Sequence, residues 1–106
     1  MGQKLLPNEL TLYRRCDEVL HYLWDPIGVS DAPGARDEYE SYLPEVFKLL
    51  IDGAGQDRIV DYLVRVETES MGLQLDRVRA TNAAFVLIEW RKWFDEMNGP
   101  GTTVRE

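Results

Sequence analysis

The chain has 106 residues, of which 44% are hydrophobic and 29% are charged, and its formal net charge is −7. This size predicts a single domain with a modest core, and this composition argues against general disorder. No apolar run approaches the ~18–20 residues that cross a bilayer, and an acidic field repels phosphate backbones, so we expect neither a membrane segment nor nucleic-acid binding.

The first predicted helix runs from about Asn8 to Trp24. Its apolar residues recur at three- and four-residue spacing and so share one face: Leu12, Tyr13, Cys16, Val19, Leu20, Leu23 and Trp24. Asp25-Pro26 should end it, because the residue before a proline is pushed out of the helical region. Cys16 is the only cysteine, so we predict a buried thiol, no internal disulfide and a reducing, cytoplasmic location.

The second predicted helix begins near Ala35 and ends before Gly53. Its first turn carries Asp37, Glu38 and Glu40, which suits the positive end of a helix dipole. Pro44 lies inside the pattern, where proline removes a donor and clashes with the preceding turn. We therefore expect this helix to be kinked or split at Pro44, with Gly53 as its left-handed terminator.

The third predicted helix runs from about Gln56 to Met71 and is ended by Gly72. Its apolar residues are expected to face inward, and Glu67 is expected to face water with the other charged residues. Arg65 has carboxylates four residues away on both sides, Asp61 and Glu69, so we predict ion pairs at both spacings.

The fourth predicted helix starts at an Asp76 cap and ends near Asn98. Its centre, residues 80–88, is apolar nearly all round, which is typical of a helix wrapped by others. We therefore expect Phe85 to be buried, so that Phe85→Ala costs about 3–5 kcal/mol. Glu89 interrupts the apolar run and is predicted to be a boundary residue that pairs with Lys92.

Together these elements predict an all-α, compact four-helix domain spanning residues 1–106, with the fourth helix central and with flexible ends at 1–7 and 99–106.

Acidic residues gather in one part of the chain. Residues 17–52 hold nine acids and two bases, a net charge of −7 that equals that of the whole chain. Such a field attracts a basic partner, and partly exposed Trp and Tyr side chains are typical anchors of interfaces. Our first hypothesis is a non-enzymatic interaction module whose acidic helical face contacts a basic protein partner through Trp24, Asp25, Asp37, Glu38, Tyr39, Glu40 and Tyr42.

The alternative hypothesis is a small metal-dependent or carboxylate-based enzyme that uses His21, Asp25 and the carboxylates of residues 37–40. Histidine and carboxylates are suitable metal ligands, but the chain has one histidine and no His-x-x-x-His pair. No nucleophile motif or phosphate loop is present either. We therefore assign no catalytic residue, metal or cofactor.

A third hypothesis concerns the end of the fourth helix. Trp90, Trp93, Phe94 and Met97 are too many apolar side chains for one helix face. We predict that some of them are exposed or meet a partner, and a symmetric homodimer through Trp90, Trp93 and Phe94 would cover them.

Two motifs resemble a known pattern. Trp24-Asp25-Pro26-Ile27-Gly28 followed by Asp37-Glu38-Tyr39-Glu40-Ser41-Tyr42 resembles small bacterial helical proteins classed as domains of unknown function. Gly53-Ala54 and Ile59-Val60-Asp61-Tyr62-Leu63 extend the similarity, which covers residues 13–72. The resemblance implies an all-α cytoplasmic domain with no established activity. In size and charge the chain is also similar to immunity proteins that block toxins, which is an analogy only.

Overall fold

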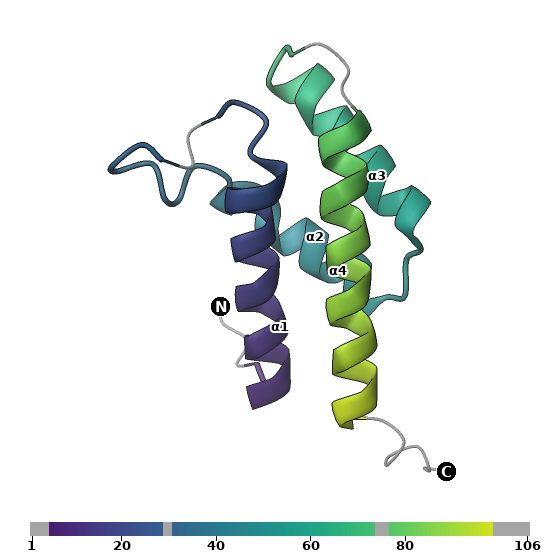
Figure 1. Ribbon diagram of the computed structural model, residues 1–106. Coiled ribbons are helices and arrows are strands. Elements are labelled where there is room, and N and C mark those ends of the chain that lie inside the picture. The colour runs from purple at the N-terminus through teal and green to yellow at the C-terminus, as the bar shows by residue number, and fades with distance from the viewer. Residues whose placement is uncertain (1–4, 29–30, 74–76, 99–106) are drawn as a thin grey trace.

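The computed structural model describes residues 5–28, 31–73 and 77–98, and these residues form helices joined by turns (Figure 1). α1 spans Pro7–Glu18 and continues as a π-helix, η1, over Val19–Trp24. A 3₁₀ turn, η2 (Glu40–Tyr42), leads into α2 (Leu43–Ile51). α3 (Gln56–Arg65) continues as a second π-helix, η3 (Val66–Ser70), and α4 spans Arg77–Asn98. The predicted all-α, four-helix fold is confirmed, whereas Asp76 and the ends 1–4 and 99–106 lie outside the described residues.

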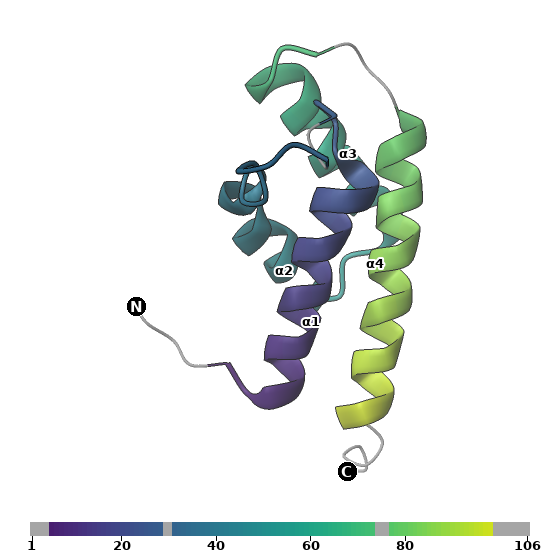
Figure 2. The same cartoon turned by 60° about the vertical axis from the view of Figure 1, so that its left-hand side comes forward.

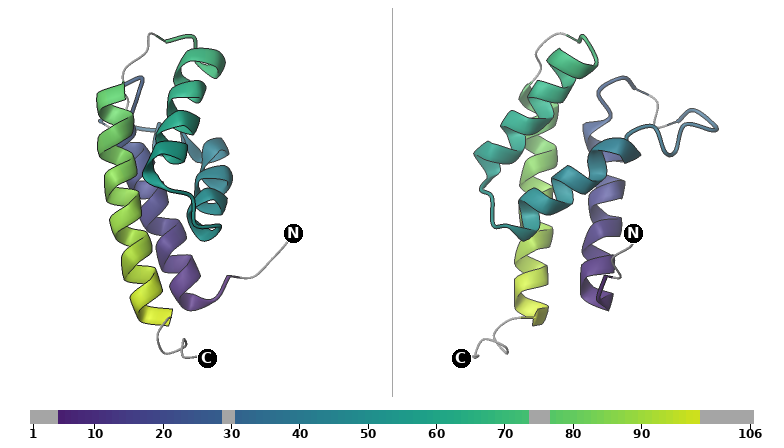
Figure 3. Two further views of the ribbon diagram at one scale, coloured as in Figure 1. Left: turned by 90° about the vertical axis from the view of Figure 1, so that its right-hand side faces the viewer. Right: turned by 180° about the vertical axis from the view of Figure 1, so that it is seen from behind.

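The helices form two layers. α1 and α4 lie side by side and antiparallel, and α3 packs along the other side of α4 (Figures 1 and 2). The short α2 lies across this assembly and contacts the other three helices (Figure 3). α4 touches α1, η1, α2 and α3, so it is the central helix that the sequence predicts.

One face of α4 is nevertheless open to solvent. Its inner face carries Ala80, Ala83, Ala84 and Leu87, all with no exposed surface. Phe85, by contrast, is 55% exposed, and Val78, Asn82 and Glu89 lie on the same outer face. The prediction that Phe85 is buried is therefore wrong. A run that is apolar all round cannot be wrapped on every side when only three other helices are available, and the small alanines mark the side that packs.

Pro44 splits the predicted second helix. Residues 36–39 are turns, η2 forms one 3₁₀ turn, and α2 begins at Leu43 with Pro44 in its first turn. Proline is tolerated there because the first turn lacks internal N–H partners. At the other end, Gly53 has φ +88° and its N–H donates to Leu50, as expected of a left-handed terminator. Arg91 of α4 also donates to the Leu50 carbonyl, which ties α2 to the central helix.

The two π-helices change which side chains face the core. The Asp25 N–H donates to the Leu20 carbonyl and the Met71 N–H to the Val66 carbonyl, both five residues back. Side chains four residues apart no longer stack in such a turn, since that rule holds for the α-helix. As a result Leu23 is 45% exposed, although α-helical spacing predicts it to be buried. Glu67, predicted to face water, is instead completely buried.

Candidate functional site

The chain leaves η1 through a turn at residues 25–28, which we call the hinge. Tyr39 fixes this turn by two hydrogen bonds. Asp25 has φ +33°, a left-handed conformation that is uncommon outside glycine. The Tyr39 hydroxyl donates to Asp25 Oδ1 at 2.7 Å and accepts from the Ile27 N–H at 3.2 Å. Burial, and next the hydrogen bond to Asp25, raise the pKa of Tyr39 above its ordinary value. The hydroxyl therefore keeps its proton at neutral pH, and this network fixes the path of residues 25–28.

A buried hydrogen bond connects the hinge to the third helix. Trp24 Nε1 donates to Glu67 Oε2 at 2.6 Å, and neither side chain is exposed to solvent. The distance is shorter than the ~2.9–3.0 Å usual for N–H···O bonds. The indole also packs against two tyrosine rings, with centroids 5.4 Å from Tyr39 and 6.2 Å from Tyr42. Trp24 thus joins η1, η2 and η3, three elements that are far apart in the sequence.

His21 lies in η1, next to the Tyr39 ring that fixes the hinge. It is 3% exposed, and its ring meets Tyr22 edge-on at 4.4 Å and lies 6.4 Å from the Tyr39 ring. Its Nδ1 is buried and has no hydrogen-bond partner within the described structure. The imidazole is therefore an internal packing group, covered by aromatic rings rather than open to a substrate.

The acidic loop, which we define as residues 31–40, extends sideways from the η1 end of α1 (Figure 1). Arg36 pairs with Asp17 of α1 at 3.1 Å and lies over the Tyr22 ring at 5.4 Å, which ties the loop to the helix. Asp37, Glu38 and Glu40 are all exposed, and none of them forms an ion pair within the described residues.

The seven predicted partner-binding residues thus fall into three groups. Asp37, Glu38 and Glu40 are accessible, and Asp25 and Tyr42 are half-buried. Trp24 and Tyr39 are 0% and 2% exposed, so their rings lie in the core and do not form part of the accessible surface of the domain. Their large rings anchor the hinge because a small domain needs aromatic area to complete its core.

The apolar side chains that do reach solvent here are different ones. Tyr22 is 57% exposed, Leu23 is 45% exposed and Ile27 is 42% exposed, all within or next to η1. Regular α-helical spacing does not predict the exposure of Leu23, because η1 winds as a π-helix. Glu67 did carry one signal in the sequence, since it follows Ile59 and Leu63 on the apolar stripe at four-residue spacing.

The structure does not assemble the ligand set of the enzyme hypothesis. His21 is buried, whereas the carboxylates of Asp37, Glu38 and Glu40 point from an exposed loop. Over residues 5–28, 31–73 and 77–98, no group of three or more His, Cys, Asp or Glu side chains is placed to hold a metal ion. In the same ranges, no helix combines the length and the hydropathy that crossing a membrane requires.

At the far end of α4, aromatic side chains pack without being buried. The Trp90 and Trp93 rings meet edge-on at 5.6 Å, and the Arg15 guanidinium lies 5.7 Å from the centroid of Trp90. Trp90 and Phe94 pack against the core and, with Trp93, remain half-exposed. Glu89 pairs with Lys92 at 3.1 Å, which confirms the predicted ion pair, but it is exposed on the outer face of α4 rather than at the edge of the core.

Comparison with protein-family models, with curated proteins and with solved structures finds no match to this chain. The resemblance to small bacterial helical domains therefore stays a prediction, and only the geometry of the described residues points to a function.

Proposed function

We propose that the protein is a non-enzymatic interaction module that presents the acidic loop to a basic protein partner. The observation that supports this most is the contrast between two kinds of side chain in one short segment. Tyr39 points inward and is hydrogen-bonded to the hinge, while Glu38 and Glu40 on either side of it are exposed. The carboxylates are therefore held on a tethered backbone, and this ordering lowers the entropic cost of binding.

The neighbouring apolar side chains supply the other half of an interface. Tyr22, Leu23 and Ile27 are exposed next to the loop, and Tyr22 is in contact with Arg36. Protein interfaces commonly combine an apolar centre with a charged rim. Complementary charge mainly speeds association and selects the partner, while the buried apolar contacts determine how long the complex lasts.

The lone cysteine and the acidic surface bear on the location of the protein and on the class of its partner. We infer a cytoplasmic protein, because a single buried thiol suits a reducing compartment. The acidic surface argues against a nucleic-acid partner. Self-association through Trp90, Trp93 and Phe94 is compatible with this role and is tested separately by light scattering at high concentration.

The test uses charge reversal with a matched control. The variant Asp37→Lys/Glu38→Lys/Glu40→Lys changes the acidic loop, and Asp57→Lys/Glu69→Lys/Glu96→Lys makes the same change in net charge at exposed acids elsewhere. A basic partner identified by affinity capture would be purified and titrated against both variants. Binding should be lost for the loop variant and kept for the control, with the circular dichroism of both unchanged. Equal losses would mean that only net charge matters, and retained binding by the loop variant would refute the proposal.

A further inference from the structure

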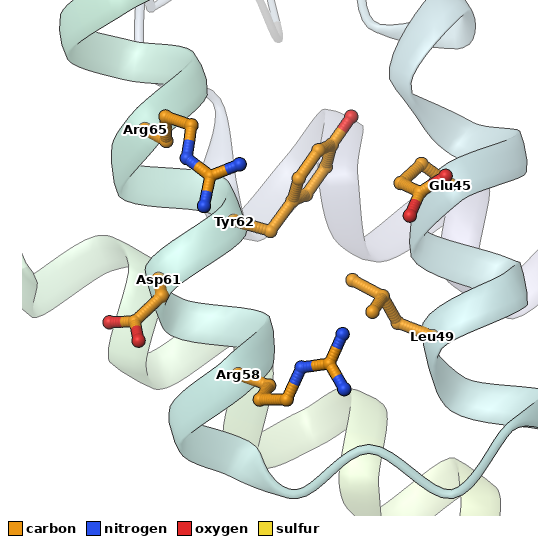
Figure 4. A pocket seen from close by; sticks show the side chains of 6 residues that line it. All are labelled: Glu45, Leu49, Arg58, Asp61, Tyr62 and Arg65. Carbon is orange, nitrogen blue, oxygen red and sulfur yellow. The ribbon is translucent and has the colours of Figure 1, made fainter.

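A groove opens between α2 and α3, away from the acidic loop. It has a volume of about 170 Å³ and is lined by Glu45 and Leu49 of α2 and by Arg58, Asp61, Tyr62 and Arg65 of α3 (Figure 4). That volume is smaller than the ~300–1,000 Å³ of drug-sized pockets, so any ligand of this groove is small.

Two arginines direct their positive charge into the groove. Figure 4 shows the guanidinium of Arg65 turned toward the Tyr62 ring and that of Arg58 turned toward Leu49. Asp61, between them in the sequence, points the other way and pairs with Arg77 of α4 at 3.2 Å. Neither the Arg58 nor the Arg65 guanidinium forms an ion pair or a side-chain hydrogen bond in the described part of the chain.

The fold itself explains why the Arg65 guanidinium has no carboxylate partner among the described residues. The sequence predicts that Arg65 pairs with Asp61 and with Glu69, and both predictions are wrong. Asp61 is held by Arg77, and Glu69 lies in the π-helix η3, where four residues no longer bring side chains onto one face. Two guanidiniums are thus left facing one opening in a chain whose net charge is −7.

The rest of the lining adds one negative charge, one hydroxyl and an apolar wall. Glu45 faces Tyr62 across the groove, and Leu49 forms the floor with 7% of its surface exposed (Figure 4). Tyr62 is half-buried, and burial followed by the nearby Glu45 charge raises the pKa of its hydroxyl. This hydroxyl therefore stays protonated at neutral pH and is available as a donor.

We propose that this groove binds a small organic molecule with two carboxylates and one ammonium group, the chemistry of a free acidic amino acid. Each guanidinium offers a planar pair of donors that matches one carboxylate. Glu45 matches the ammonium, while Tyr62 and Leu49 pack against the carbon chain. The guanidinium of Arg65 lies beside the Tyr62 ring and that of Arg58 lies beside Leu49, so the two do not converge on one point (Figure 4). Two separate carboxylates suit that arrangement better than one phosphate.

The test titrates the purified full chain with L-glutamate, L-aspartate, glutarate, L-glutamine and inorganic phosphate, followed by calorimetry and amide NMR shifts. An acidic amino acid should bind best and shift the amides of α2 and α3. Glutamine, which lacks one carboxylate, and phosphate should bind at least tenfold more weakly. Equal binding of phosphate would reduce the groove to a general anion site and overturn the proposal, as would the absence of binding by both acidic amino acids.

Variants assign each charge a role. Arg58→Gln and Arg65→Gln should each weaken glutamate binding roughly ten- to hundredfold, as loss of a charge-assisted contact predicts. Arg14→Gln is the matched control, because Arg14 is also exposed and without an ion pair among the described residues but lies on α1. Glu45→Gln should weaken glutamate binding and leave glutarate binding unchanged or stronger, because glutarate has no ammonium. Equal effects of the Arg14 and Arg58 variants, or equal effects of Glu45→Gln on both ligands, would contradict the proposed contacts. These residues lie outside the acidic loop, so either outcome is independent of partner binding there.

Discussion

The hydrogen bond between Trp24 and Glu67 should couple η1 to η3, and a double-mutant cycle can measure that coupling. Trp24→Phe removes the donor, and Glu67→Met replaces the carboxylate by an apolar side chain of similar length. Glu67→Met leaves the buried indole N–H without an acceptor, which costs about 1–3 kcal/mol. Trp24→Phe removes the donor from a buried carboxylate and adds a cavity term for the smaller ring.

The double variant removes both partners, so it leaves no polar group of this pair unsatisfied. Its loss of unfolding free energy should therefore be smaller than the sum of the losses of the two single variants. A hydrogen bond to a carboxylate contributes about 1.5–3 kcal/mol, and we expect an interaction energy of that size. Because domains of this length are stable by only about 5–15 kcal/mol, the effect lies well within the range of a urea titration.

The assay is urea unfolding followed by far-UV circular dichroism, which does not depend on the tryptophan that is removed. Glu67→Gln, which keeps an acceptor oxygen, should lie closer to the wild type than Glu67→Met. The matched control replaces Trp24→Phe by Trp90→Phe, a half-buried tryptophan in another part of the molecule. That control cycle should be additive. If the Trp24–Glu67 cycle is also additive within about 0.5 kcal/mol, the bond does not couple the two elements and the reasoning is refuted.

Two further predictions follow from burial. Phe85→Ala should lower the free energy of unfolding by less than about 1 kcal/mol, because the Phe85 ring is 55% exposed. Leu87→Ala, at a fully buried position, should lower it by about 2–5 kcal/mol in the same urea titration. Equal losses for the two variants would contradict the open face of α4. Burial raises the pKa of Cys16 from 9.0 to about 12, so the folded state keeps a proton that the unfolded state loses above pH 9. The free energy of unfolding should thus fall as pH rises through this window, by up to about 1.4 kcal/mol per pH unit, and Cys16→Ala should have a shallower alkaline slope than the wild type in urea titrations over that range.

Helix positions could be predicted from local signals. Pro26 lies just beyond the end of η1, and the φ of +88° at Gly53 supports its role as terminator. Pro44 marked the break in the second helix, although periodicity placed the start of that helix eight residues too early. These signals act within a few residues of the chain, which is why sequence alone is sufficient for them.

The contacts of the candidate site could not be predicted in the same way. Glu67 lies on an apolar stripe, but a charged side chain is rarely buried without a partner, and its partner Trp24 is 43 residues away. Asp61 has an oppositely charged residue at the favourable i,i+4 spacing, yet it pairs with Arg77 of another helix. Such choices depend on how helices pack, and a surface ion pair of about 0–1 kcal/mol is too weak to enforce the local alternative.

The two π-helices also show how the fold accommodates one more residue between fixed contacts. A ring closed by a bond to the fifth residue back holds one residue more than an α-helical ring, so η1 is equivalent to an α-helix with one residue inserted. Tyr22 and Leu23 are exposed and should tolerate substitution. Deleting either one would let the segment wind as an α-helix with Trp24 still on nearly the same side, because an α turn with one residue fewer covers the same arc. An aligned chain with a one-residue gap at this point should therefore have an α-helical turn in place of η1 and keep the Trp24–Glu67 bond.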